Sequence, residues 1–248
     1  MAGDLWVRRF HPSPHARIRL VCFPHAGGSA SYFFPVSSAL RPAIEVLALQ
    51  YPGRQDRRSE PSIDDIGELA DRLHKAVAPW CRPGTAFFGH SMGAILAFEV
   101  ARRLERKEGV SPAALIVSGR RGPTTERDET VHLRPDAGLL AELRELSGTD
   151  AAMLDEEGFA ELILPALRSD YTAIETYRHE PGPPLTCPIL ALTGDQDPKT
   201  TVAEVKDWSR HTSGPFDLKV HPGGHFYLNE RSGEVIGDIA GYLRSLPL

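Results

Sequence analysis

Short runs of consecutive apolar residues alternate along this 248-residue chain with longer segments in which apolar residues recur every three or four positions. Runs of the first kind predict strands that are buried on both faces, and segments of the second kind predict amphipathic helices. The six predicted strands are 19–23, 44–51, 85–88, 113–118, 188–194 and 216–221. The predicted helices outside the middle of the chain are 63–77, 92–107, 202–210 and 234–246. This alternation predicts an α/β fold with an open, mostly parallel, doubly wound sheet.

Residues 123–184 break the alternation, because they contain no convincing strand. They predict two helices instead, one over 136–146 and a second run over 156–177 that Pro165 interrupts. Some sixty residues are too many for a simple connector, so we expect a lid or a small helical subdomain. No Gly- or Ser-rich linker separates it from the rest. We therefore expect residues 1–248 to form a single domain, with 123–184 as a helical lid insertion.

The charge of the chain limits its partners. Lys and Arg number 28 against 33 Asp and Glu, a formal net charge of −5. Binding to nucleic acid needs clustered basic residues, and the chain contains no basic block, so we expect no nucleic-acid partner. It has no signal-peptide pattern and no run of about 18 apolar residues. We expect a soluble cytoplasmic protein without a membrane segment.

Three cysteines, Cys22, Cys81 and Cys187, are widely spaced. Disulfide frameworks and zinc sites need more cysteines at closer spacing. We interpret all three as buried apolar residues in a reducing compartment, and we expect no metal site.

The segment 87–94, F-F-G-H-S-M-G-A, contains a G-x-S-x-G pattern between a predicted strand and a predicted helix. This setting is typical of a nucleophile elbow, in which small residues let strand and helix approach while the serine side chain projects from the sheet edge. Ser91 is therefore the candidate nucleophile. We interpret its neighbour His90 as structural.

A serine nucleophile needs a base, and the base needs an acid that orients it. His225 follows the last predicted strand in a Gly-rich loop, with His221 as the alternative base. Asp197 follows the strand 188–194, and Asp195 is the alternative acid. The order Ser, Asp, His is that of α/β-hydrolases. We predict Ser91, Asp197 and His225 as a catalytic triad.

An oxyanion hole needs two N–H groups directed at the developing negative charge. The residue after the nucleophile, Met92, supplies one in such enzymes. The run H-A-G-G after the first predicted strand is suited to supply the other, from Ala26. A phosphate-binding loop is disfavoured because neither G-x-G-x-x-G nor G-K-[ST] is present.

Five motifs occur in order over nearly the whole chain: F-P-H-A-G-G (23–28), L-Q-Y-P-G-R-Q-D-R (49–57), F-G-H-S-M-G-A (88–94), L-T-G-D-Q-D-P (192–198) and P-G-G-H-F-Y-L (222–228). Together they resemble the stand-alone type II thioesterases of polyketide synthases and nonribosomal peptide synthetases. The vertebrate medium-chain fatty-acid thioesterase is similar. The first two motifs discriminate best, since G-x-S-x-G occurs in many hydrolases.

The resemblance implies an α/β-hydrolase fold and the same triad and oxyanion donors. It implies a mobile helical lid over an acyl chamber, and an editing role. That role is removal of aberrant or stalled acyl groups from the phosphopantetheine arm of an acyl or peptidyl carrier protein. No cofactor is required, and a monomer is our default. We place His25, Gly27, Met153 and Tyr171 nearest the substrate.

Other functions stay open at this point. One is a general carboxylesterase or lipase, and another is a thioesterase that terminates medium-chain fatty acyl synthesis on a carrier protein. A non-catalytic interaction protein is disfavoured because every triad and oxyanion position is filled. Five arginines after predicted strands are candidates for a patch that docks an acidic carrier protein: Arg54, Arg57, Arg58, Arg120 and Arg121.

Overall fold

A single twisted sheet forms the centre of the computed structural model, which describes residues 5–146 and 158–247. Within this part of the chain the strands are β1 (Val7–Arg8), β2 (Ile18–Phe23), β3 (Ile44–Leu49), β4 (Thr85–His90), β5 (Leu115–Ser118), β6 (Ile189–Gly194) and β7 (Phe216–His221). Their order across the sheet is β1-β3-β2-β4-β5-β6-β7. Only the pairing of β1 with β3 is antiparallel, whereas the other neighbours are parallel. The predicted parallel sheet is confirmed.

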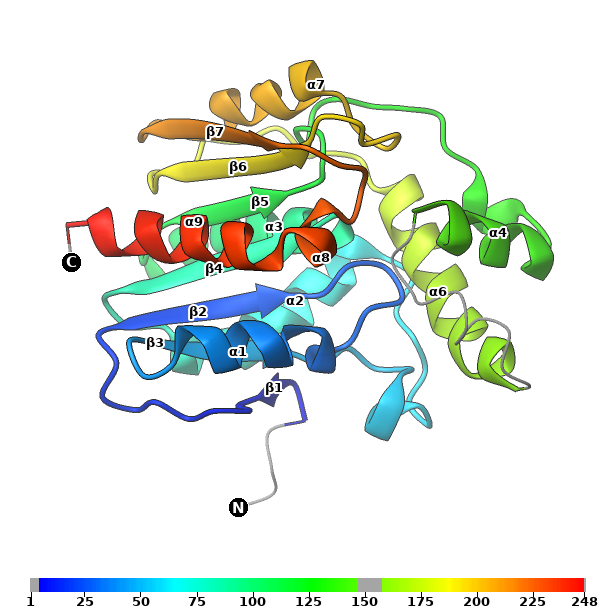
Figure 1. Ribbon diagram of the computed structural model, residues 1–248, viewed down its shortest axis with the longest axis horizontal. Helices are drawn as coiled ribbons and strands as arrows, with labels where there is room; N and C mark the ends of the chain where they lie inside the picture. The colour runs from blue at the N-terminus through cyan, green and yellow to red at the C-terminus, as the bar shows by residue number, and fades with distance from the viewer. Residues whose placement is uncertain (1–4, 147–157, 248) are drawn as a thin grey trace.

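Helices cover both faces of the sheet, which explains why its strands are nearly continuous in apolar residues. Side chains alternate along each strand, so that Val21 and Phe87 join one core cluster while Leu20 and Phe88 join the other. The helices are α1 (Phe34–Leu40), α2 (Ile66–Val77), α3 (Met92–Glu108), α4 (Asp136–Leu146), α6 (Phe159–Thr176), α7 (Val202–Lys206), α8 (Tyr227–Glu230) and α9 (Ser232–Ser245). Helices α1 and α9 cover one face, and α2 and α3 lie behind the sheet in the view of Figure 1.

Each strand and helix predicted from the sequence is present, with bounds shifted by a few residues. Among the described strands and α-helices, three were not predicted. Strand β1 has two residues, α8 has four, and α1 has seven with two serines, so none is long enough to show a clear periodicity. None of the described helices is both long and apolar enough to cross a membrane.

The insertion between β5 and β6 contributes α4 and α6, and contains no strand among its described residues. Both helices lie beyond the carboxyl ends of the parallel strands, on the right of Figure 1. The prediction that Pro165 interrupts the second helix is wrong, because α6 continues through it. Pro165 is exposed and costs the helix one hydrogen bond and some crowding with the carbonyl four residues earlier, and the buried residues that follow it, from Ala166 onward, keep the helix continuous.

Two of the three cysteines are buried, as predicted. Cys22 and Cys187 have almost no exposed surface, Cys81 is partly buried, and all three are free. Burial raises the pKa of the Cys81 thiol to about 11 and that of Cys187 to about 12. These thiols therefore stay protonated near neutral pH, which fits their role as packing residues.

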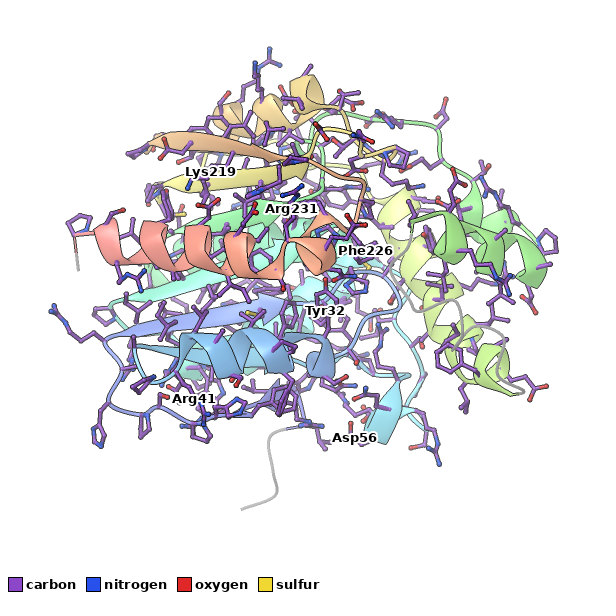
Figure 2. The ribbon with its side chains drawn as sticks, viewed as in Figure 1. Tyr32, Arg41, Asp56, Lys219, Phe226 and Arg231 are labelled. Carbon is purple, nitrogen blue, oxygen red and sulfur yellow. The ribbon has the colours of Figure 1, made fainter. Side chains whose placement is uncertain are left out.

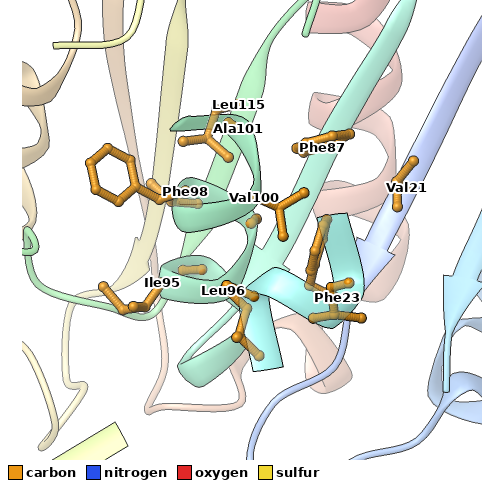
Figure 3. Close-up of a cluster of buried hydrophobic side chains, with 14 of the residues drawn as sticks. Val21, Phe23, Phe87, Ile95, Leu96, Phe98, Val100, Ala101 and Leu115 are labelled. Atoms are coloured by element: carbon orange, nitrogen blue, oxygen red, sulfur yellow. The ribbon is translucent and has the colours of Figure 1, made fainter. Parts of the chain in front are cut away.

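Helix α3 packs against the middle of the sheet at very short range. Figure 3 shows Leu96 and Val100 of this helix beside Phe23 and Phe87 of the strands. The approach is closest at the start of the helix, where a Cβ on Gly93 would lie only 2.1 Å from the carbonyl oxygen of Phe23. No side chain fits there, so glycine is required for the helix to reach the end of β2.

We expect Gly93→Ala to lower the free energy of unfolding by about 3 kcal/mol, because backbone atoms of β2 must move to admit the methyl group. Gly237→Ala is the matched control. Gly237 lies in α9 with open space at its Cβ position, so alanine there should stabilise the helix by up to about 1 kcal/mol. Urea unfolding of both variants measures the difference. Equal effects of the two substitutions would contradict the argument from close approach.

Candidate active site

Ser91 occupies the sharp turn between β4 and α3. Its φ of 54° and ψ of −119° form a conformation that L-residues rarely adopt and that costs about 1 to 3 kcal/mol. The turn is held by a hydrogen bond of 2.8 Å from the Ser91 N–H to the carbonyl of Ser118 in the next strand. A Cβ on Gly89 would lie 2.0 Å from the carbonyl oxygen of Gly93. Both glycines of G-x-S-x-G are thus needed for the turn.

Ser91, His225 and Asp197 form one hydrogen-bonded chain, although they come from three separate loops. The Ser91 hydroxyl lies 3.1 Å from Nε2 of His225, and Nδ1 of the same ring lies 2.9 Å from Oδ2 of Asp197. The Asp197 carboxylate is fully buried and also accepts a hydrogen bond of 2.8 Å from the N–H of Lys199. This is the arrangement in which a histidine takes a proton from a serine while a buried carboxylate orients the ring.

The alternative residues have other contacts. Asp195 accepts a hydrogen bond of 2.9 Å from the N–H of Gly223, so it joins two loops and does not reach His225. The ring of His221 stacks on Tyr227. Nδ1 of His90 lies 3.0 Å from the hydroxyl of Ser118, which supports the interpretation of His90 as a structural residue.

The two predicted oxyanion donors are Met92, which directly follows Ser91, and Ala26, which lies in the loop after β2. Met92 is the first residue of α3, where the backbone N–H groups have no acceptor within the helix. Ala26 lies in the loop that follows β2, and the contact between Gly93 and Phe23 holds this loop beside the start of α3. Its neighbour Gly27 has a φ of 73° and donates its N–H to Asp170 of α6. That N–H is therefore occupied within the protein.

His25 is packed among aromatic rings beside the proposed base. Its ring contacts Tyr32 and Phe226, which Figure 2 shows near the carboxyl ends of the strands, and it lies 6.0 Å from the ring of His90. Burial, together with the charges of His225 and Arg54, lowers the pKa of His25 to about 3. Burial also lowers the pKa of His90 well below its usual value. Both rings are therefore neutral near pH 7.

A cavity of about 510 Å³ opens between the loop after β2 and helix α6. The loop side is largely polar, and the side formed by α6 is apolar. Its lining residues include His25, Gly27, Arg58, Phe159, Leu162 and Ile163. Of the predicted substrate contacts, His25 and Gly27 thus line this cavity. Tyr171 is instead buried in the cluster between α4 and α6, and Met153 lies outside the described residues.

A family model for the thioesterase domain matches residues 18–243. The chain belongs to the thioesterase family. This thioesterase is 55% identical over 242 residues to "Thioesterase PikA5" of Streptomyces venezuelae, an alignment that covers 97% of this chain and 86% of the relative.

Solved structures agree with the family. The type II thioesterase BorB from the borrelidin biosynthetic cluster is 50% identical with a TM-score of 0.92, and the match covers 98% of this chain and 99% of BorB. The thioesterase RedJ from the prodiginine pathway of Streptomyces coelicolor is 36% identical with a TM-score of 0.87, covering 93% of this chain and 87% of RedJ. This thioesterase therefore has the α/β-hydrolase fold and is a type II thioesterase of the polyketide and nonribosomal peptide systems, an enzyme that hydrolyses thioesters.

Four of the five arginines that the sequence suggested for docking are buried, so the predicted patch is wrong at these positions. Arg54 pairs with Asp170, Arg57 with Glu60, and Arg120 and Arg121 with Glu129. Arg58 alone of the five is exposed, and it lines the cavity. An arginine near the end of a strand can be buried and donate its hydrogen bonds within the protein. Its position in the sequence and its charge do not distinguish it from an exposed arginine that binds a partner.

The sequence analysis missed Asp170. The second half of α6 around it, R-S-D-Y-T-A-I-E-T (168–176), is largely polar, so no local signal marked this carboxylate as buried. Such a residue is expected to have a cationic partner when it is buried.

We expect the free energy of unfolding to fall as the pH is lowered from about 6.5 to about 4.5. The pKa values of His25 and His90 are lowered by folding, so over this range the unfolded chain binds protons at these rings and the folded chain does not. Each such histidine lowers the free energy of unfolding by up to about 1.4 kcal/mol for each unit by which the pH falls. His25→Gln should reduce the slope of stability against pH in this window. His15→Gln, a change at an exposed ring, is the control. An unchanged slope in His25→Gln, measured by urea unfolding at several pH values, would contradict the burial argument.

Proposed function

We propose that this enzyme removes acyl groups from the phosphopantetheine thiol of acyl or peptidyl carrier proteins and so edits stalled or aberrant intermediates. The reaction uses Ser91 as nucleophile, His225 as base and Asp197 as the residue that orients the base. The observation that carries the proposal is the hydrogen-bonded chain Ser91–His225–Asp197 at the start of α3. The similarity to type II thioesterases of biosynthetic clusters supports the class of substrate.

Acylation begins when His225 Nε2 takes the proton of Ser91 as the hydroxyl oxygen attacks the thioester carbonyl. The charge that develops on the carbonyl oxygen is stabilised by the N–H groups of Met92 and Ala26. The positive end of the α3 dipole acts in the same direction. Collapse of the tetrahedral intermediate breaks the C–S bond. Because a thiol has a pKa of about 8.5, the thiolate leaves with little assistance, and the proton held by His225 then passes to it, which restores the neutral ring for the second half of the reaction.

Deacylation repeats the same steps with water. His225 takes a proton from water, the resulting hydroxide attacks the acyl-serine carbonyl, and the Ser91 oxygen leaves with the proton held by His225. The buried Asp197 carboxylate keeps the ring in the correct tautomer and stabilises its cationic form. Both halves of the reaction therefore need the same five groups, which are the three triad side chains and the two backbone N–H donors, and no cofactor takes part.

We assign the helical insertion, residues 123–184, the role of a lid over the acyl group. Phe159, Leu162 and Ile163 of α6 give the cavity its apolar side, and the Leu162 side chain is 64% exposed. A contiguous apolar surface of this kind beside a site is typical of a surface that covers a ligand. Leu139, Leu143 and Leu167, in contrast, pack within the insertion.

We expect the enzyme to hydrolyse an acyl thioester much faster than the matching oxygen ester, and Ser91→Ala to abolish turnover. Asp197→Asn should lower kcat about 10⁴-fold because the ring of His225 then adopts the wrong tautomer. The measurement is a panel of acyl groups loaded on purified carrier proteins, followed by intact-protein mass, beside small acyl thioesters and esters.

Asp195→Asn is the matched control for the acid. It changes a carboxylate in the same loop whose contact is with the N–H of Gly223, and it should retain most of the activity. Equal loss in the two variants would contradict the assignment of Asp197. Preference for oxygen esters would instead identify a general carboxylesterase.

Arg58 is the remaining candidate for contact with a carrier protein. It is exposed and borders the cavity beside the loop that carries Ala26. The chain is net negative, so an acidic carrier protein needs a local positive charge near the entrance of the site. Arg58 provides such a charge.

We expect Arg58→Glu to slow hydrolysis of carrier-bound acyl groups more than that of a small acyl thioester, with a difference that shrinks as salt is added. Arg41→Glu is the control, because it reverses an exposed charge just before β3, near the amino ends of the parallel strands in Figure 2 and so at the other end of the sheet from the site. Steady-state rates on both substrates test the idea. Equal slowing of the two substrates by Arg58→Glu would refute it.

A further inference from the structure

A buried ion pair joins the helical insertion to the loop after β3. The Arg54 guanidinium donates from Nη1 to Oδ2 of Asp170 at 2.7 Å and from Nη2 to Oδ1 at 2.8 Å. The side chain of Arg54 is 7% exposed and that of Asp170 is 0% exposed. Two parallel hydrogen bonds between a guanidinium and a carboxylate fix both position and orientation.

The same two side chains hold the loop that carries Ala26. Oδ2 of Asp170 accepts a hydrogen bond of 2.7 Å from the N–H of Gly27, and Nη1 of Arg54 donates to the carbonyl of Gly28 at 3.1 Å. Asp170 therefore binds a backbone donor of the loop, and Arg54 binds a backbone acceptor of the same loop. The ion pair and the loop form a single hydrogen-bonded unit.

Packing reinforces these hydrogen bonds from both sides. Leu167 lies one turn before Asp170 in α6 and close to Gly27. A Cβ added to Gly27 would be 2.8 Å from Cδ1 of Leu167. The Arg54 guanidinium lies over the ring of Tyr51, whose hydroxyl donates to the carbonyl of Pro24. The loop is thus fixed at its start and at its glycines.

We propose that Arg54 and Asp170 are positioning residues that aim the Ala26 N–H at the oxyanion. The Gly27 N–H belongs to the planar peptide unit that joins Ala26 to Gly27, so the hydrogen bond to Asp170 fixes the orientation of that unit. With this side of Ala26 fixed, the Ala26 N–H can turn less. The proposal rests on the proposed function, since it assumes that Ala26 serves as a donor. It also makes the helical insertion part of the catalytic architecture.

Removing one member of the pair leaves a buried charge without its partner, so Asp170→Ala can fail to fold. The double variant Arg54→Met/Asp170→Leu avoids this, because apolar side chains of similar volume replace both charges. It removes the acceptor for Gly27 and the donor for Gly28 while leaving the region filled. Both variants are compared with the wild-type enzyme.

Each preparation is first titrated with a serine-directed phosphonate to count active sites. On a small acyl thioester we expect kcat per site to fall about 100-fold in both variants, with KM nearly unchanged, because misplacement of one catalytic group by about 1 Å has this size of effect. A trifluoromethyl ketone analogue of the acyl group forms a tetrahedral adduct with Ser91 and probes the oxyanion site directly. Its inhibition constant should rise by the same factor as kcat falls.

Glu45→Gln is the control for loss of a buried ion pair as such. The Glu45 carboxylate is fully buried, binds Arg9 and Arg19, and lies at the amino end of β3, away from Ser91. It should lower stability without changing kcat per site or the inhibition constant. Wild-type values of both quantities in the Arg54 and Asp170 variants, or equal changes in Glu45→Gln, would overturn the proposal. If the wild-type enzyme itself binds neither probe at Ser91, the proposed function fails instead.

Discussion

The contact between Gly93 and the end of β2 is the constraint on which the site depends. At this point a helix backbone and a strand backbone approach so closely that no side chain fits between them. Because α3 begins at Met92 and the loop with Ala26 begins just after Phe23, the contact holds both proposed oxyanion donors beside the elbow. The strained backbone of Ser91 is retained because the two neighbouring strands and the helix leave the turn no alternative. The same close packing of α3 on β2 therefore positions the nucleophile and the proposed oxyanion donors.

The sequence predicted the sheet and the site motifs well because both depend on local patterns. Buried parallel strands are continuous in apolar residues, and each motif follows the carboxyl end of such a strand, where Ser91, Asp197 and His225 converge. The preference for Asp197 over Asp195 rested on depth within one loop, and the hydrogen bonds agree with it.

Other features could not be predicted because they depend on which distant residues meet. Whether Arg54, Arg57 and Arg121 are solvated or internal is decided by carboxylates far away in the sequence or by the path of their own loops. The continuation of α6 through Pro165 depends on packing along the helix. In both cases local propensity is overruled by tertiary contacts.

The two halves of α6 are anchored differently. Beyond Pro165, Ala173 and Ile174 belong to the main core and Asp170 holds the loop after β2. Before Pro165, Phe159 and Ile163 are only partly buried and line the cavity. The missing N–H of the proline lowers the bending stiffness of the helix at this boundary. The direction of the loop after β2 and the shape of the cavity wall therefore depend on different halves of one helix, so a substitution before Pro165 can reshape the wall without disturbing the contact between Asp170 and Gly27.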